Sequence, residues 1–94
     1  MVPPATALTN NTLARTKAFS LYRQLMRGSK KMPTPDRQEF VRFKTRTEYR
    51  ENMHLTDPEQ IDFHLRLAEF NLDTVLAQAE HLSTLFADPR YHKT

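Results

Sequence analysis

The chain has 94 residues, of which 38% are hydrophobic and 27% charged, with one glycine, six prolines and no cysteine. This length accommodates one small domain, and the lack of cysteine excludes disulfides, thiolate zinc sites and thiol nucleophiles. A single glycine excludes glycine-rich phosphate loops, and no apolar run approaches the ~18 residues that a membrane span needs. The composition therefore predicts a small helical domain.

Charge is distributed unevenly along the chain. Residues 1–54 carry eleven lysines and arginines against four acidic residues, a balance of +7, whereas residues 55–94 carry three against seven, a balance of −4. Such a basic half suits nucleic acid, an anionic membrane or an acidic protein. Ordinary solvated helix faces are the alternative, but the segregation favours a polyanionic partner.

The first part of the chain divides into an arm and a helix. Residues 1–11 are uncharged and contain Pro3 and Pro4, which predicts an extended N-terminal arm. A first helix then follows and runs to about Lys31, with Asn10, Asn11 or Thr12 as its N-cap. Its buried positions, at helical spacing, are Ala14, Ala18, Leu21 or Tyr22, and Leu25.

Two proline-containing turns separate the remaining helices. Thr34 before Pro35 is typical of an N-cap and predicts a second helix over residues 35–52. Its apolar positions are Phe40, Phe43, Thr47 and Tyr49. The segment Thr56-Asp57-Pro58-Glu59-Gln60 contains two capping-box spacings and predicts a third helix over residues 58–86.

The third helix carries two apolar stripes. The longer stripe contains Ile61, Leu65, Ala68, Leu72, Val75, Leu76, Ala79, Leu82 and Phe86, and the shorter one contains Phe63, Leu67 and Phe70. A helix with two apolar faces must bury both, so one face needs a partner or a ligand. Because short loops join the helices, we predict an antiparallel, up-down-up three-helix bundle over residues 12–87, followed by a polar tail over residues 88–94.

The residues that carry catalysis or metal binding in other proteins show no constellation in this sequence. None of the four histidines, at positions 54, 64, 81 and 92, has a second histidine three or four residues away. The carboxylates Asp62, Glu69, Asp73 and Glu80 match the polar face of the third helix. We therefore expect neither a metal site nor enzymatic activity.

Basic residues line up on two of the predicted helices. Arg42, Arg46 and Arg50 recur every four residues on the second helix, and Arg23, Arg27 and Lys30 form a similar line on the first. Arginine forks suit carboxylate and phosphate partners. The sequence lacks the interleaved aromatics of a base-stacking surface. RNA phosphate, an acidic helical protein and a phosphopantetheine group all remain candidate partners.

The tripeptide Leu21-Tyr22-Arg23 in the first helix of a small basic chain resembles the LYR-motif (complex I LYR-like) family. Arg27, the segment Tyr49-Arg50-Glu51-Asn52 and the helix start Asp57-Pro58 with Ile61 extend the resemblance over roughly residues 13–86. The resemblance implies a non-catalytic mitochondrial adaptor or accessory subunit. It also implies binding of the mitochondrial acyl carrier protein, whose acyl-4'-phosphopantetheine chain inserts between the helices of family members. No cofactor is then bound directly.

The resemblance transfers specific roles to this chain. The expected partner-binding residues are Leu21, Tyr22, Arg23, Arg27, Lys44, Arg46, Tyr49 and Arg50. The excess of apolar surface on the third helix further predicts an acyl-chain groove formed by Leu25, Phe40, Leu65, Ala68 and Leu72. The alternative is that Tyr22 and Tyr49 are ordinary core aromatics and that the groove is a packed core.

The host assembly is open between three candidates. Ser29-Lys30 and the segment from Lys44 to Met53 resemble the accessory LYR subunit of the Fe–S cysteine desulfurase, which we favour. The tract from Asn52 to Asp62 resembles the LYR subunit of respiratory complex I, as an accessory subunit or assembly factor, and Asp36-Arg37 with Phe40 resembles the LYR module of mitochondrial ribosome assembly. All three imply the mitochondrial matrix or the matrix side of the inner membrane. We expect no direct nucleic-acid binding.

Overall fold

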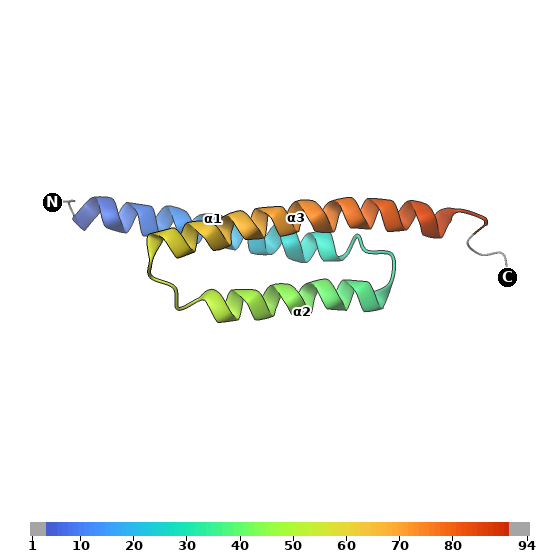
Figure 1. Cartoon of the computed structure of the whole chain (residues 1–94), viewed down its shortest axis with the longest axis horizontal. Helices are drawn as coiled ribbons and strands as arrows, with labels where there is room; N and C mark the ends of the chain where they lie inside the picture. Colours follow the sequence, from blue (N-terminus) through green and yellow to red (C-terminus); the bar gives the residue numbers. More distant parts are fainter. Residues whose placement is uncertain (1–3, 91–94) are drawn as a thin grey trace.

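The computed structural model describes the backbone of residues 4–90 and the side chains of residues 12–90. Over this range the chain forms three helices, α1 (Pro4–Ser29), α2 (Pro35–Asn52) and α3 (Pro58–Ala87), and no strand. Successive helices run in opposite directions and form an elongated body of 68 × 18 × 17 Å (Figure 1). The all-α three-helix bundle predicted from the sequence is therefore confirmed.

The start of α1 differs from the prediction. The helix begins at Pro4, so residues 4–11, expected to form an extended arm, are helical. Proline is tolerated at the first position of a helix because it needs no N–H there, and the alanines and leucine that follow are strong helix formers. Pro4 therefore marks the helix start. Residues 1–3 of the expected arm and residues 91–94 of the expected tail lie outside the described part of the chain.

The starts of α2 and α3 follow from local capping. Thr34 is the N-cap of α2, and its hydroxyl accepts a hydrogen bond from the backbone N–H of Arg37 at 3.3 Å. Asp57 is the N-cap of α3, and its carboxylate accepts from the N–H of Glu59 at 3.0 Å. Of the two capping-box spacings in the sequence, the one that begins at Asp57 therefore coincides with the observed N-cap.

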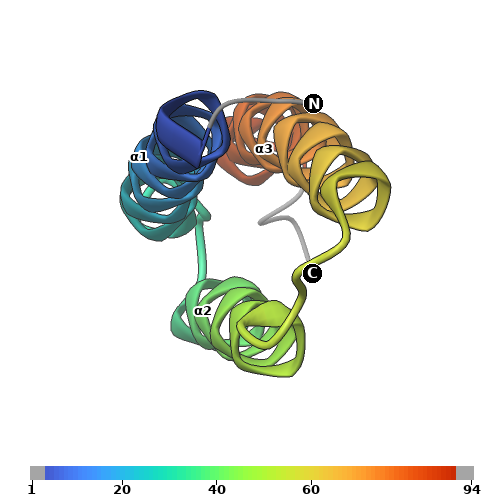
Figure 2. The same ribbon diagram turned by 90° about the vertical axis from the view of Figure 1, so that its left-hand side faces the viewer.

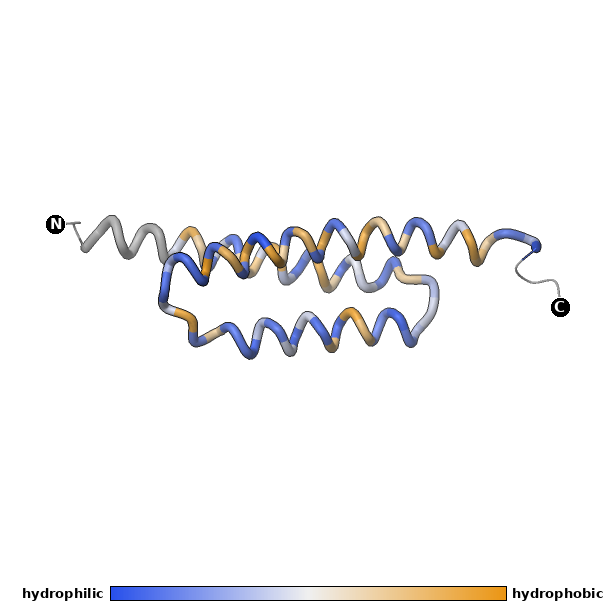
Figure 3. Tube along the Cα trace, viewed as in Figure 1, coloured by the Kyte–Doolittle hydropathy of each residue, from blue (hydrophilic) through white to orange (hydrophobic). Residues whose placement is uncertain are grey.

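Helix α1 is the centre of the bundle. It packs against both other helices, whereas α2 and α3 meet only weakly. Viewed along the bundle, the helices occupy the corners of a triangle in which α2 is set apart from α1 and α3 (Figure 2). The hydropathy pattern agrees, because apolar positions are frequent on α1 and α3 and sparse on α2 (Figure 3). The side of the bundle between α2 and α3 is therefore open.

Two small clusters form the core. Leu21 and Leu25 of α1 pack with Ala68 and Leu72 of α3, and Tyr49, Leu65 and Val75 lie around them. Towards the C-terminal end of α3, a second cluster contains Met32, Val41 and Ala79, with Val75 and Leu82 beside it. The longer stripe predicted on α3 supplies much of both clusters.

The predicted apolar face of α2 is wrong at Phe40 and Phe43, whereas the predicted Tyr49 does pack against the core. Phe40 and Phe43 are 66% and 65% exposed, and the residues that α2 buries are Val41 and Thr45. One turn of an α-helix takes 3.6 residues, so Val41 points about 100° away from Phe40. Helix α2 turns its small residues inward and leaves its phenylalanines at the surface.

The shorter stripe of α3 stays uncovered, as the two-stripe pattern predicts. Phe63 and Phe70 are exposed by 62% and 66%, and Leu67 between them is also exposed. Because α1 and α2 both lie on the other side of α3, neither covers this surface. We call Phe63, Leu67 and Phe70 the α3 stripe.

Candidate functional site

The Leu-Tyr-Arg tripeptide lies in the middle of α1 and joins α1 to α2. Leu21 is buried in the core, while Tyr22 contacts Tyr49 edge-to-face, with ring centroids 5.0 Å apart. The Tyr49 hydroxyl donates a hydrogen bond to the backbone carbonyl of Ala18 at 2.9 Å. Burial and the neighbouring carboxylate of Glu48 raise the pKa of Tyr49 to about 12. The two tyrosines therefore hold the helices together, and Arg23 is the member of the tripeptide that faces solvent.

The predicted basic residues divide into paired and unpaired groups. Lys44 pairs with Glu48 at 3.8 Å, and Arg42 pairs with Glu39 at 3.0 Å. Among the residues with described side chains, six exposed arginines have no ion pair: the predicted Arg23, Arg27, Arg46 and Arg50, together with Arg15 and Arg37. Unpaired arginines on α1 and α2 can meet an external carboxylate or phosphate without first breaking an internal contact.

A cavity of about 950 Å³ lies where the described side chains of α1, the end of α2 and the start of α3 converge. We call it the apolar cavity. Its interior includes Ala18, Leu65 and Ala68, and Arg50 is among its polar lining residues. The full lining is Ala14, Arg15, Ala18, Phe19, Tyr49, Arg50, Asn52, Met53, His54, Leu55, Thr56, Ile61, His64, Leu65 and Ala68. A hydrocarbon chain with an anionic end matches this combination of an apolar interior and cationic side chains.

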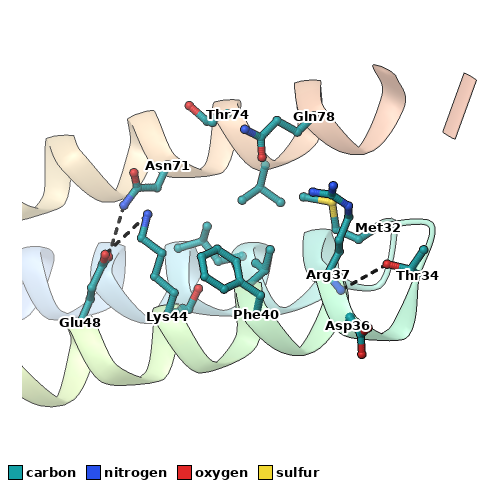
Figure 4. A pocket seen from close by; sticks show the side chains of 14 residues that line it. Met32, Thr34, Asp36, Arg37, Phe40, Lys44, Glu48, Asn71, Thr74 and Gln78 are labelled. Atoms are coloured by element: carbon teal, nitrogen blue, oxygen red, sulfur yellow. Dashed lines mark hydrogen bonds and ion pairs between the residues drawn. The ribbon is translucent and has the colours of Figure 1, made fainter. Parts of the chain in front are cut away.

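A second cavity of about 670 Å³ opens between α2 and α3 towards the other end of the bundle (Figure 4). We call it the polar cavity. Leu25, Val41 and Val75 contribute apolar surface, and Phe40 lies at its α2 side. The other lining residues are Met32, Thr34, Asp36, Arg37, Lys44, Thr45, Glu48, Asn71, Thr74 and Gln78. Nine of its fourteen lining side chains carry hydroxyls, amides or charges, so its lining is more polar than that of the apolar cavity.

The predicted groove residues fall into both cavities. Leu65 and Ala68 line the apolar cavity, and Leu25 and Phe40 line the polar cavity. Leu72 lines neither cavity, because it is buried in the core between them. The residues of the single groove predicted from the sequence are thus divided between two separate cavities.

Sequence reasoning overlooked two features of this region. Arg15 lines the apolar cavity from α1, and its spacing of eight residues from Arg23 gave a signal for the same helix side. Glu48 of α2 accepts a hydrogen bond from the Asn71 side chain of α3 at 3.3 Å. A contact between residues so far apart in the chain leaves no mark in local sequence pattern.

The comparisons with known proteins identify the family. Residues 16–74 match the family described as Complex 1 protein (LYR family). The chain belongs to the LYR family. LYR motif-containing protein 4A of Salmo salar is 34% identical to this LYR protein over 65 residues, which is 69% of the chain and 71% of the relative. LYR motif-containing protein 4 of Danio rerio is 32% identical over 65 residues, 69% of the chain and 73% of the relative.

Family membership gives this LYR protein a general role. LYR proteins are small accessory proteins, generally without catalytic activity, and they work through partners. In the described residues of this chain, no three histidine or acidic side chains lie close enough to hold a metal ion. None of the described helices combines the length and apolarity needed to cross a membrane.

Proposed function

We propose that this LYR protein is a mitochondrial adaptor that binds acylated acyl carrier protein and attaches it to the Fe–S cysteine desulfurase. The observation that carries the proposal is the apolar cavity, whose lining combines Ala18, Leu65 and Ala68 with Arg15 and Arg50. An acyl chain fits the apolar interior, and the acidic surface and phosphate of the carrier fit the arginines.

Charge supports the docking of the carrier on α1 and α2. The unpaired Arg23, Arg46 and Arg50 belong to the +7 half of the chain, and an acidic helix is the complementary partner. Arginine also forms two parallel hydrogen bonds to one carboxylate, which fixes the orientation of a bound helix.

The open side of the bundle supports burial of the acyl chain. Because α2 and α3 meet only weakly, a chain can enter between them without breaking an extensive interface. Each buried methylene contributes roughly 0.8 kcal/mol, so the acylated carrier gains affinity that the unacylated carrier lacks. Salt does not screen this component.

The electrostatic half of the proposal is tested by charge reversal. The double variant Arg46→Glu/Arg50→Glu is expected to abolish carrier binding in isothermal titration calorimetry while the helical circular dichroism is kept. The control Arg66→Glu/Arg90→Glu changes the net charge equally in the acidic half of the chain and is expected to retain binding. Unchanged binding by the first variant would contradict the proposed docking surface.

The acyl-chain half is tested by filling the apolar cavity. Ala68→Phe is expected to weaken binding of the acylated carrier much more than that of the unacylated carrier. Ala68 is also a core residue, so Ala14→Phe serves as a second variant because Ala14 is only half-buried and lines the same cavity. Ala77→Phe, at an exposed position outside both cavities, is the control. An equal loss of both carrier forms would place Ala68 in an ordinary core.

The α3 stripe provides the second surface that an adaptor needs. We assign Phe63, Leu67 and Phe70 to the desulfurase, since exposed apolar patches mark interaction sites. Affinity purification from mitochondria with mass spectrometry is expected to recover the carrier and the desulfurase. The variant Phe63→Ser/Phe70→Ser is expected to lose the desulfurase and keep the carrier. Recovery of complex I subunits or ribosome precursors in place of the desulfurase would favour the other two hosts.

Direct binding of RNA through the basic residues is the competing function. The dependence of affinity on salt concentration distinguishes RNA binding from binding of the acylated carrier. RNA affinity falls steeply and log-linearly with salt concentration, since bound counterions are released. Binding of an acylated carrier is expected to level off at high salt, because the buried chain is insensitive to screening. A steep loss with no plateau would favour RNA or another purely ionic partner.

A further inference from the structure

The outer side of α2 carries an apolar surface that the bundle does not cover. Phe40 and Phe43 are 66% and 65% exposed. Arg46 and Arg50 follow Phe43 after three and seven residues, so they lie on the same side of the helix. Neither arginine forms an ion pair within the described part of the chain. We call these four residues the α2 face, in which two exposed rings lie beside two unpaired cations.

The α3 stripe has the opposite charge at its edge. Helix α3 contains five acidic residues against one arginine. Glu59 and Asp62 lie beside the start of the stripe, and both are exposed. Asp62 pairs at the surface with Arg66 at 3.0 Å, whereas Glu59 forms no ion pair with any described residue. The stripe therefore offers apolar side chains next to negative charge.

The α2 face and the α3 stripe have matching spacing when the two helices run antiparallel. With Phe43 placed opposite Leu67, Phe40 falls opposite Phe70, because each pair is three residues apart. In this register both arginines of the α2 face lie within one helical turn of the two carboxylates beside the stripe. At 100° per residue, the arginines and the carboxylates lie on the same rotational side of their apolar residues, and antiparallel helices bring equal sides together. Cations therefore meet carboxylates where rings meet apolar side chains.

A second copy of the chain is the partner that brings these surfaces together. Within one molecule they do not meet, because α2 and α3 occupy different corners of the bundle and both surfaces are exposed (Figure 2). A contact between two α3 stripes would bring two acidic helices together, and like charges across an interface cost free energy. The α2 face of one copy on the α3 stripe of another instead pairs opposite charges.

We propose that the free chain associates head to tail, with the α2 face of one copy on the α3 stripe of the next. Each contact withdraws exposed apolar surface from water and pairs arginines with carboxylates. Because the contact joins two different surfaces, a pair of copies still has one α2 face and one α3 stripe uncovered. Association therefore continues beyond a dimer.

Sedimentation velocity of the full chain over a range of concentrations tests this contact. The mass of the wild-type assembly is expected to rise past that of a dimer. Arg46→Glu/Arg50→Glu and Phe63→Ser/Phe70→Ser each disrupt one of the two surfaces, and each is expected to lower the association constant about tenfold or more. An equimolar mixture of these two variants is expected to form a dimer and nothing larger, since the first supplies an intact α3 stripe and the second an intact α2 face.

Lys30→Glu/Lys31→Glu is the matched control. Both lysines are exposed, and the change in net charge equals that of the arginine variant, so this control is expected to associate as the wild type does. Circular dichroism verifies that all variants stay helical. A wild-type chain that stays monomeric, or a mixture that forms no dimer, would overturn the head-to-tail contact. Undiminished association of either double variant alone would overturn it in favour of a symmetric contact or another surface.

Head-to-tail association also has a consequence for the order of assembly, which rests on the proposed function. There the carrier binds Arg46 and Arg50, so saturating carrier covers every α2 face and leaves every α3 stripe free for the desulfurase. Unacylated carrier is expected to convert the assemblies into complexes with one copy of each protein. Assemblies that persist at saturating carrier would overturn this competition and the proposed carrier docking with it. The mixture of the two variants contains no carrier, so it tests the head-to-tail contact independently.

Discussion

At Gly28 the backbone of α1 comes close to α3. A Cβ atom at this position would lie 3.3 Å from Val75 Cγ1 and 3.4 Å from Leu76 Cδ2, which is tighter than ordinary contact. Glycine normally weakens a helix by about 1 kcal/mol relative to alanine. The close approach to α3 gives a packing reason for tolerating that cost near the end of α1.

Substitution of Gly28 tests this packing reason. Gly28→Val is expected to destabilise the protein by ~1–3 kcal/mol, because a branched side chain overpacks the contact with Val75. Gly28→Ala is expected to be nearly neutral, since the gain in helix propensity offsets a small displacement. Chemical denaturation measures both, with Ser20→Val on the exposed side of α1 as the control. Equal stability of Gly28→Val and the control would show that α1 and α3 have room at this point.

The hydroxyl of Tyr49 makes stability depend on pH. Its pKa is raised from 10.0 to about 12, so the folded state holds the proton more tightly than the unfolded state. The free energy of unfolding is then unaffected below pH 10 and falls as pH rises from 10 towards about 12. In Tyr49→Phe this part of the fall is expected to vanish, at a cost of about 1 kcal/mol at neutral pH for the lost hydrogen bond to Ala18. Denaturation of both proteins across this pH range measures the difference, and parallel curves would contradict the assignment.

The sequence predicted the role of a single residue correctly where that role depends on neighbouring residues in the chain. Thr34 and Asp57 are N-caps because their side chains reach backbone N–H groups two or three residues ahead. The role of Gly28 depends on Val75 and Leu76, far away in the chain, so no local sequence pattern could indicate it. The bond between Glu48 and Asn71 was missed for the same reason.

At the scale of the element, α2 has few apolar residues, and its sequence pattern therefore does not determine which of its faces is buried. Large side chains favoured the face with Phe40 and Phe43, but the buried face carries Val41 and Thr45. The contact of Tyr49 with Tyr22, and its hydrogen bond to Ala18, fix which side of α2 meets α1. Those contacts depend on the tertiary arrangement, so periodicity alone could not choose between the two faces.

The orientation of α2 predicts a contrast between two apolar residues. Val41→Ala is expected to destabilise the protein by ~1–2 kcal/mol, because Val41 packs with Met32 and Ala79 in the second core cluster. Phe43→Ala removes a larger side chain but is expected to change the free energy of unfolding by no more than about 0.5 kcal/mol, since Phe43 is exposed. Urea denaturation measures the free energy of unfolding of both variants. A larger loss for Phe43→Ala would indicate that α2 is turned the other way.

The buried and exposed faces of α3 were predicted more accurately than those of α2, because the apolar residues of α3 are numerous and regularly spaced. Ala68, Leu72 and Ala79 are buried, as the longer stripe predicts, while the α3 stripe is exposed. Thirty residues of consistent spacing define a face far better than the eighteen of α2. The sequence thus located both the core side of α3 and its free surface.

At the scale of the whole molecule, the antiparallel bundle was predictable because short loops leave few other topologies. The open side between α2 and α3 was not, because it depends on α2 lying closer to α1 than to α3. The consequence is a thin body, 68 Å long and under 20 Å across, with a core divided into two small clusters. Such a molecule buries little apolar surface for its length, so a bound ligand has a large effect on its stability.

A core this thin leaves the isolated chain with little stability of its own. The chain alone is expected to unfold at low temperature in a broad transition and to self-associate, because the α3 stripe is exposed and the core is small.

The octanoyl form of the carrier binds only the folded chain, and at a hundredfold excess over its dissociation constant it is expected to stabilise the chain by about 2.7 kcal/mol. At the same concentration, unacylated carrier is expected to stabilise it less, and Ala68→Phe to remove the difference. Differential scanning calorimetry with size-exclusion chromatography measures both effects. A monodisperse monomer with a sharp, high melting transition, unchanged by either carrier, would show that the bundle is complete by itself.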